Sequence, residues 1–104
     1  MKIFLPPFLY KIVAEEKWSD ECLQLTEEDF PFIHLAEHDQ LERILDKYWQ
    51  KIPCVILKLD TAKLPGRLVY EANPGGSNKY YHLYDGSIPH SAVVGVFTDK
   101  DLFK

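Results

Sequence analysis

Strand-forming and turn-forming residues alternate along most of the chain. Runs rich in β-branched and aromatic residues are bounded by proline, glycine and asparagine, which is typical of β-strands separated by turns. Strands are therefore predicted at residues 8–13, 32–35, 55–60, 68–72, 80–84 and 92–97. Residues 73–78, with the sequence Asn-Pro-Gly-Gly-Ser-Asn, give the strongest loop signal, and Asp85-Gly86 predicts a turn.

Two helices are predicted between the early strands. A short helix is expected over residues 14–22, where Trp18 stands among charged residues, and a clearer one over residues 37–49. The second helix has one apolar stripe, made by Leu41, Ile44, Leu45, Tyr48 and Trp49. We predict that this stripe packs in the core and does not form a cofactor site.

The order β-α-β-α-β-β-β-β predicts an α+β fold. Strands that cluster late in the sequence argue against a doubly wound parallel sheet. A chain of 104 residues with no composition break predicts a single domain over residues 1–104.

Charge and hydropathy narrow the function classes. The formal net charge is −4, with 12 basic residues scattered among 16 acidic ones, so no nucleic-acid partner is expected. No apolar run approaches the roughly 18 residues of a membrane-spanning helix, so no membrane association is expected. Cys22 and Cys54 are too few and too far apart for a metal knuckle or a disulfide framework. A reduced cytoplasmic location is predicted.

Four polar residues interrupt the predicted strands: His34, Glu71, His82 and Tyr84. An unpaired polar group buried in such a strand would cost roughly 1–3 kcal/mol, so each of them needs a partner. Two histidines and a carboxylate that converge on one cleft are suited to binding a polar ligand or to general acid–base chemistry.

Side-chain alternation along the strands predicts how these residues are oriented. It places Phe32 and His34 on one face of a sheet, with Val69 and Glu71 sharing another.

Each of the four residues also has an alternative, structural interpretation. His34 would be a satisfied core histidine and Glu71 a solvated edge residue. His82 and Tyr84 would brace the Asp85 turn through hydrogen bonds. Zinc held by the two histidines and a carboxylate is a minor alternative, and no metal site is predicted because nothing in the spacing favours one.

The ordered combination of these segments resembles a family of small bacterial proteins known as domain of unknown function 952. The resemblance covers nearly the whole chain. It is carried by Leu-Tyr-Lys-Ile at 9–12, Trp18, Phe-Ile-His-Leu at 32–35, Gln40, Val-Ile-Leu-Lys-Leu-Asp at 55–60, Leu-Val-Tyr-Glu at 68–71, Gly-Gly at 75–76, His-Leu-Tyr at 82–84 and Ala-Val at 92–93.

The resemblance implies an ADP-ribosyltransferase-like fold, with a split, strongly bent mixed or antiparallel β-sheet and two helices around a central cleft. It also implies NAD as the candidate ligand. His34 and Glu71 would then be catalytic: His34 positions the nucleotide, and Glu71 stabilises the cationic sugar that forms when nicotinamide leaves. Lys11, His82 and Tyr84 would bind the ligand.

Some positions depart from the family pattern. Lys11 stands where the family usually has a first-strand histidine, and Ala36 stands where it usually has serine. Both changes remove an expected ligand contact, although Lys11 would still meet a phosphate or carboxylate as a point charge.

Three function classes follow. The first is an NAD-dependent ADP-ribosyl-type transferase or glycohydrolase. The second is a catalytically inactive module that binds a small polar ligand or nucleotide in the same cleft. The third is a protein-interaction module with a patch that includes Trp18, Phe30 or Phe103.

Overall fold

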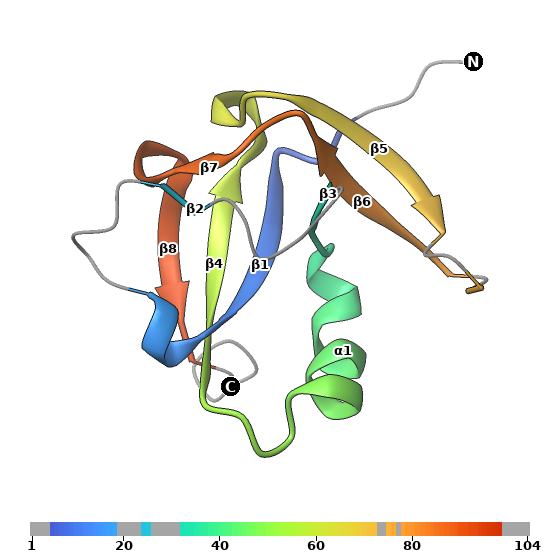
Figure 1. Ribbon diagram of the computed structural model, residues 1–104, viewed down its shortest axis with the longest axis vertical. Coiled ribbons are helices and arrows are strands. Elements are labelled where there is room, and N and C mark those ends of the chain that lie inside the picture. The colour runs from blue at the N-terminus through green and yellow to red at the C-terminus, as the bar shows by residue number, and fades with distance from the viewer. Residues whose placement is uncertain (1–4, 19–23, 26–31, 73–74, 77, 99–104) are drawn as a thin grey trace.

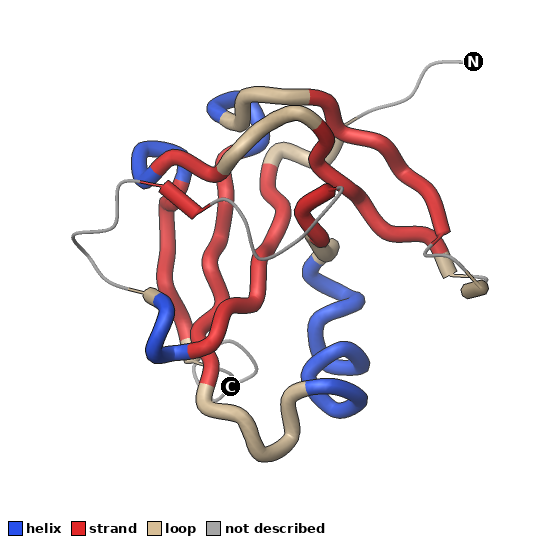
Figure 2. Tube along the Cα trace, in the orientation of Figure 1, coloured by secondary structure: helices blue, strands red, loops and turns tan. Residues whose placement is uncertain are grey.

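The structure is a computed structural model that describes residues 5–18, 24–25, 32–72, 75–76 and 78–98. These residues contain one α-helix, α1 (Leu41–Tyr48), and eight strands: β1 (Phe8–Ala14), β2 (Gln24–Leu25), β3 (Phe32–His34), β4 (Cys54–Asp60), β5 (Arg67–Ala72), β6 (Lys79–Tyr84), β7 (Ile88–Pro89) and β8 (Val93–Phe97). The remaining helical segments are single 3-10 turns at the ends of these elements (Figure 2): η1 (Glu15–Lys17), η2 (His38–Gln40), η3 (Thr61–Lys63) and η4 (His90–Ala92).

The strands form two antiparallel three-stranded sheets, in the orders β1-β4-β8 and β3-β6-β5, and β2 pairs with β7. In Figure 1 the first sheet stands on the left, β5 and β6 extend to the right, and α1 lies below β3. Tyr10 and Ala36 join the sheets, since each donates its backbone N–H to the carbonyl of the other at 2.8 Å. The predicted α+β class is confirmed, and every strand pair is antiparallel.

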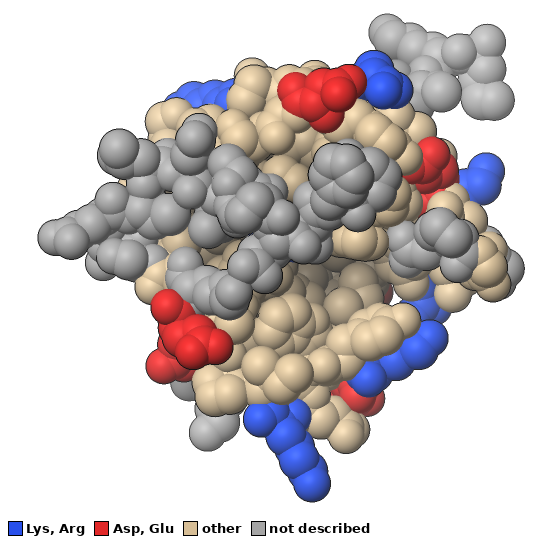
Figure 3. Space-filling model, in the orientation of Figure 1, with Lys and Arg blue, Asp and Glu red and all other residues tan. Residues whose placement is uncertain are grey.

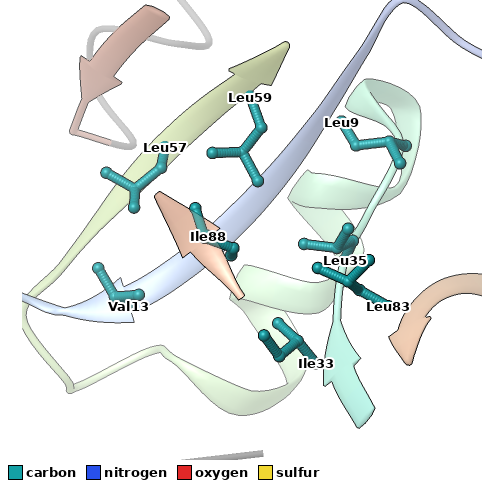
Figure 4. Close-up of a cluster of buried hydrophobic side chains, with 8 residues drawn as sticks. All are labelled: Leu9, Val13, Ile33, Leu35, Leu57, Leu59, Leu83 and Ile88. Atoms are coloured by element: carbon teal, nitrogen blue, oxygen red, sulfur yellow. The ribbon is translucent and has the colours of Figure 1, made fainter. Parts of the chain in front are cut away.

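A buried apolar cluster fills the space between the two sheets. Alternation along β1 and β4 directs one set of side chains toward it, and β3, β6 and β7 contribute the rest (Figure 4). Its members are Leu9, Val13, Ile33, Leu35, Leu57, Leu59, Leu83 and Ile88. This cluster places one face of the β3-β6-β5 sheet in the core.

Helix α1 covers the opposite side of the β1-β4-β8 sheet. Tyr10, Ile12 and Ile56 point from this side of the sheet toward Leu41 and Leu45 of the helix. A capping box precedes the helix, in which the Glu37 backbone N–H donates to the Gln40 side chain at 2.9 Å. The predicted helix over residues 37–49 is therefore present, with its first turn wound as η2 and its regular part ending at Tyr48.

The shorter predicted helix, over residues 14–22, is wrong in its described part. Only Glu15–Lys17 is helical, as one 3-10 turn, and Trp18 has extended backbone angles. Residues 19–22 lie outside the described residues. The structure therefore has one α-helix among its described residues, where the sequence predicted two. A stretch of nine residues with a single large apolar side chain gives no apolar face to hold a longer helix.

Two turns, at Pro65-Gly66 and at Asp85-Gly86, pack against each other. Gly66 has φ +107°, a conformation that L side chains rarely adopt, and a Cβ there would lie 2.6 Å from the Tyr84 carbonyl oxygen. A Cβ at Gly86 would overlap the Pro65 carbonyl oxygen. The close approach of these backbones fixes where β5 begins and β6 ends.

Charged side chains are spread over the surface that Figure 3 shows. The described lysines, arginines and carboxylates lie round the margin of this face, with uncharged surface between them. Among the described residues, no helix has the length and apolar character needed to cross a membrane.

Candidate functional site

One face of the β3-β6-β5 sheet carries all four candidate residues. The antiparallel register pairs His34 with His82 and Glu71 with Tyr80. Because directly paired residues in antiparallel strands point to the same side, His34, Glu71, His82 and Tyr84 share one face. The sequence analysis assigned Phe32 and His34 to one face and Val69 and Glu71 to another; the register corrects this, since Val69 pairs with His82.

Glu71 is the acceptor in a small hydrogen-bond network. Its Oε2 lies 2.8 Å from Nδ1 of His82 and also accepts a hydrogen bond from the Tyr84 hydroxyl. The Tyr84 hydrogen bond, followed by the His82 hydrogen bond, lowers the pKa of Glu71 below its ordinary value. The same bond to Glu71 raises the pKa of Tyr84. The network therefore holds Glu71 as a carboxylate and Tyr84 as a neutral phenol.

His82 is completely buried within this network. Its ring stacks on Phe32 with centroids 3.9 Å apart and planes inclined by 16°. The ring of His34 meets it edge-on, with centroids 5.3 Å apart. A ligand on this face would therefore meet His34 and Glu71, and His82 would act on the ligand through them. Nδ1 of His82 hydrogen-bonds to Glu71 and not to the Asp85 turn.

His34 is exposed at the edge of a pocket of about 400 Å³. The interpretation of His34 as a core histidine is therefore wrong. The pocket lies beside the Tyr10–Ala36 bridge and takes its lining from β1, the end of β3, α1 and β6. It is lined by Tyr10, Lys11, Ile12, His34, Leu35, Ala36, Ile44, Tyr48, Trp49 and Tyr80. Glu71, His82 and Tyr84 do not line this pocket, whereas the candidate residues Lys11 and His34 do.

Part of the predicted apolar stripe of α1 forms a wall of the pocket. Leu41 and Leu45 are buried as predicted, whereas the Tyr48 side chain is 61% exposed. Ile44, Tyr48 and Trp49 line the pocket. Ile44 and Trp49 also pack, partly buried, against the core cluster under α1, so the prediction that the whole stripe is core is wrong for Tyr48. Aromatic walls around a polar group are typical of small-molecule sites.

Lys11 borders the pocket from a different direction. Alternation along β1 places Lys11 on the side of Leu9 and Val13, opposite to Tyr10 and Ile12. Ala36, the other departure from the family pattern, is buried at the bridge to Tyr10. A serine hydroxyl at this position would therefore be close to the pocket, and this chain lacks it.

Two residues whose contacts were not predicted from the sequence connect α1 and the η2 turn before it to β6. Arg43 donates from Nη2 to the Tyr80 hydroxyl at 3.0 Å. Gln40 donates from Nε2 to the Lys79 carbonyl at 2.9 Å. Both contacts join segments about forty residues apart, which no local pattern reveals. They hold Tyr80 at the pocket between the helix and the sheet.

The predicted interaction patch concerns Trp18, Phe30 or Phe103, and the zinc alternative concerns groups of metal ligands. Trp18 packs at the edge of the core and stacks on His90, with centroids 5.5 Å apart. Phe30 and Phe103, the other members of the predicted interaction patch, lie outside the described residues. Within the part of the chain that the structure describes, no group of three or more His, Cys, Asp or Glu side chains is placed to hold a metal ion.

A family comparison matches residues 12–96 to the description "Protein of unknown function (DUF952)". This chain belongs to the DUF952 family. The match runs from β1 into β8 and includes the polar face and the residues that line the pocket, apart from Tyr10 and Lys11. A comparison with curated proteins gives no match.

Two crystal structures have the same fold as this DUF952 protein. Protein CC0527 of Caulobacter crescentus has a TM-score of 0.69 and 24% sequence identity, with 88% of this chain and 84% of that chain covered. A double mutant of the same protein gives a TM-score of 0.69 and 23% identity with the same coverage. Likeness at this level of identity establishes the fold, and function has to be argued from the site.

Proposed function

We propose that this protein binds a nucleotide of the NAD type. The nicotinamide ring would occupy the pocket beside α1, and the ribose attached to it would lie at His34. The observation that carries the proposal is the exposed imidazole of His34 at the mouth of an aromatic-walled pocket. The proposal includes an ADP-ribosyltransferase-like fold with NAD bound in a central cleft, as the family resemblance implied.

The size and lining of the pocket support this ligand class. A volume of about 400 Å³ accommodates a base and its sugar. It lies within the range of roughly 300–1,000 Å³ found for small-molecule sites. Tyr48, Trp49 and Tyr80 offer ring faces, on which a base stacks favourably. A complete dinucleotide would extend beyond the pocket across the polar face of the β3-β6-β5 sheet.

A catalytic version of this function is favoured by the position of Glu71. It shares the sheet face with His34, and its side chain is 34% exposed. Hydrogen bonds from Tyr84 and His82 favour its carboxylate form. A fixed carboxylate stabilises the cationic sugar that develops when nicotinamide leaves. NAD cleavage or ADP-ribosyl transfer is therefore the second candidate, with Glu71 and His34 as catalytic residues and Tyr84 and His82 as positioning residues.

The binding proposal is tested by calorimetry and thermal shift with NAD, ADP-ribose and nicotinamide mononucleotide. A ligand at 100 times its Kd stabilises the fold by roughly 2.7 kcal/mol. For a domain of this size that is a rise in Tm on the order of 10–20 °C. The absence of any shift at millimolar concentrations of all three ligands would overturn the proposal.

Two exposed tyrosines provide a matched pair of variants. Tyr48→Ala removes a ring from the pocket wall, and we expect affinity to fall roughly 5- to 100-fold. Tyr70→Ala removes a ring of similar exposure that does not line the pocket, and affinity should stay within twofold. Equal affinities in the two variants would place the ligand elsewhere.

Catalysis is separated from binding by Glu71→Gln. The amide keeps the shape of the side chain and removes its charge, so NAD should still bind while release of nicotinamide stops. Binding without nicotinamide release by the wild-type protein would identify the inactive ligand-binding module instead. Release that persists unchanged in Glu71→Gln would exclude this residue from the chemistry.

A further inference from the structure

We propose that the bound ligand carries a phosphate, and that Arg43 on α1 recognises it at the rim of the pocket. This inference rests on the proposed function and deepens it, because it assigns the anion-binding group that pocket lining and family resemblance left to Lys11. It is carried by the arrangement of side chains around α1 and by the contact between Arg43 and Tyr80.

The surface of α1 is divided by residue type. Successive residues are 100° apart around a helix, so residues four apart lie on the same stripe. Leu41 and Leu45 form the buried stripe, and Ile44 and Tyr48 form the neighbouring stripe that lines the pocket. Arg43 and Lys47 form the stripe next to the pocket-lining one. Glu42 and Asp46 form the stripe on the side of the helix opposite to the pocket.

Contacts confirm that the basic stripe lies next to the pocket. Arg43 donates to the hydroxyl of Tyr80, which lines the pocket from β6. The Lys47 ammonium lies 5.2 Å from the ring centre of Tyr48, which lines it from α1. Figure 3 shows basic side chains at the surface beside α1, below the end of the β5–β6 hairpin. In a chain of net charge −4, these two cations each lie against a ring that lines the pocket.

Arg43 is better placed for an anion than Lys11. Lys11 lines the pocket and is half-buried, whereas Arg43 is exposed and donates a hydrogen bond to Tyr80 at the pocket rim. A guanidinium offers several N–H donors in a planar fork that matches phosphate oxygens. One N–H can remain on Tyr80 while others meet a phosphate attached to the sugar at His34. The rim therefore selects for a phosphorylated ligand.

The test compares a nucleotide with its nucleoside. Nicotinamide mononucleotide and nicotinamide riboside are titrated by calorimetry into the wild-type protein and into Arg43→Gln, with Lys63→Gln as a control for loss of a positive charge on η3. We expect Arg43→Gln to lower the affinity for the mononucleotide roughly 10- to 100-fold and the affinity for the riboside less than twofold. Added salt should weaken mononucleotide binding in the wild type more than in the variant.

A second variant separates phosphate recognition from support of the pocket wall. Tyr80→Phe keeps the ring and removes the hydroxyl that Arg43 contacts. If Arg43 acts only by holding Tyr80, both ligands weaken in Arg43→Gln and Tyr80→Phe reproduces the loss, which overturns the inference. Equal binding of both ligands to the wild type also overturns it and leaves the proposed function intact. Binding of neither ligand overturns the proposed function as well.

Discussion

Replacement of His82 by alanine tests whether the polar network is part of the folded structure. The His82 side chain is completely buried, stacks on Phe32 at 3.9 Å and hydrogen-bonds to Glu71. Truncating a buried ring leaves a cavity and removes an aromatic contact, which together cost about 2–4 kcal/mol. Loss of the hydrogen bond acts in the same direction. In a domain of this size the variant should unfold roughly 10–30 °C below the wild type.

The matched control is His34→Ala. His34 pairs with His82 in the register but is exposed, so its removal should cost less than about 1 kcal/mol. Urea unfolding followed by circular dichroism gives both free energies of unfolding, and equal slopes confirm that the variants unfold in the same way. If His82→Ala unfolds within 1 kcal/mol of the wild type, or if His34→Ala is the more destabilised variant, the packing described for this face is wrong.

Three further predictions concern the fold and its pH dependence. Leu45→Ala should lower the free energy of unfolding by about 2–5 kcal/mol through a cavity under α1, and a loss well below 1 kcal/mol in urea would show that this helix face is exposed. Glu71 has a folded pKa below its ordinary value of 4.5, so its stabilisation is complete above that pH and is lost as the pH falls through the folded value. The stability difference between wild type and Glu71→Gln should therefore shrink from about pH 7 to about pH 3, and a constant difference would contradict this. Gly86→Ala should cost about 1–3 kcal/mol or more because its Cβ overlaps Pro65, whereas Gly75→Ala meets open space and should cost only the strain of φ +80°, about 1 kcal/mol; equal Tm losses would refute the packing of the two turns.

Strands with strong local patterns were predicted well from the sequence. Val55 to Asp60 and Tyr80 to Tyr84 combine β-formers with clear turn boundaries, and both lie within observed strands. The two-residue strands β2 and β7 were missed, because Gln24–Leu25 and Ile88–Pro89 pair across the chain and carry no periodicity of their own. The 14–22 helix failed because one tryptophan among charges does not make an apolar face.

The site was predictable in its residue types and not in its geometry. His34, Glu71 and His82 were identified because each is a polar residue inside an otherwise apolar strand. The register that places them on one face depends on long-range pairing, which the sequence does not encode locally. The pocket was missed because Tyr48 belongs to an apolar stripe whose outer part turns away from the core. Periodicity identifies a stripe but does not show how much of it is covered.

The two tryptophans of the chain provide the most direct test of the proposed binding site. Trp49 lines the pocket, whereas Trp18 lies at the edge of the core and is not among the residues that line it. Indole N–H signals are followed by ¹⁵N–¹H NMR during titration with nicotinamide mononucleotide. We expect the Trp49 signal to shift in a saturable way while the Trp18 signal stays in place. A Trp49 signal that does not move at millimolar ligand, or movement of Trp18 alone, would show that the nucleotide does not bind in this pocket.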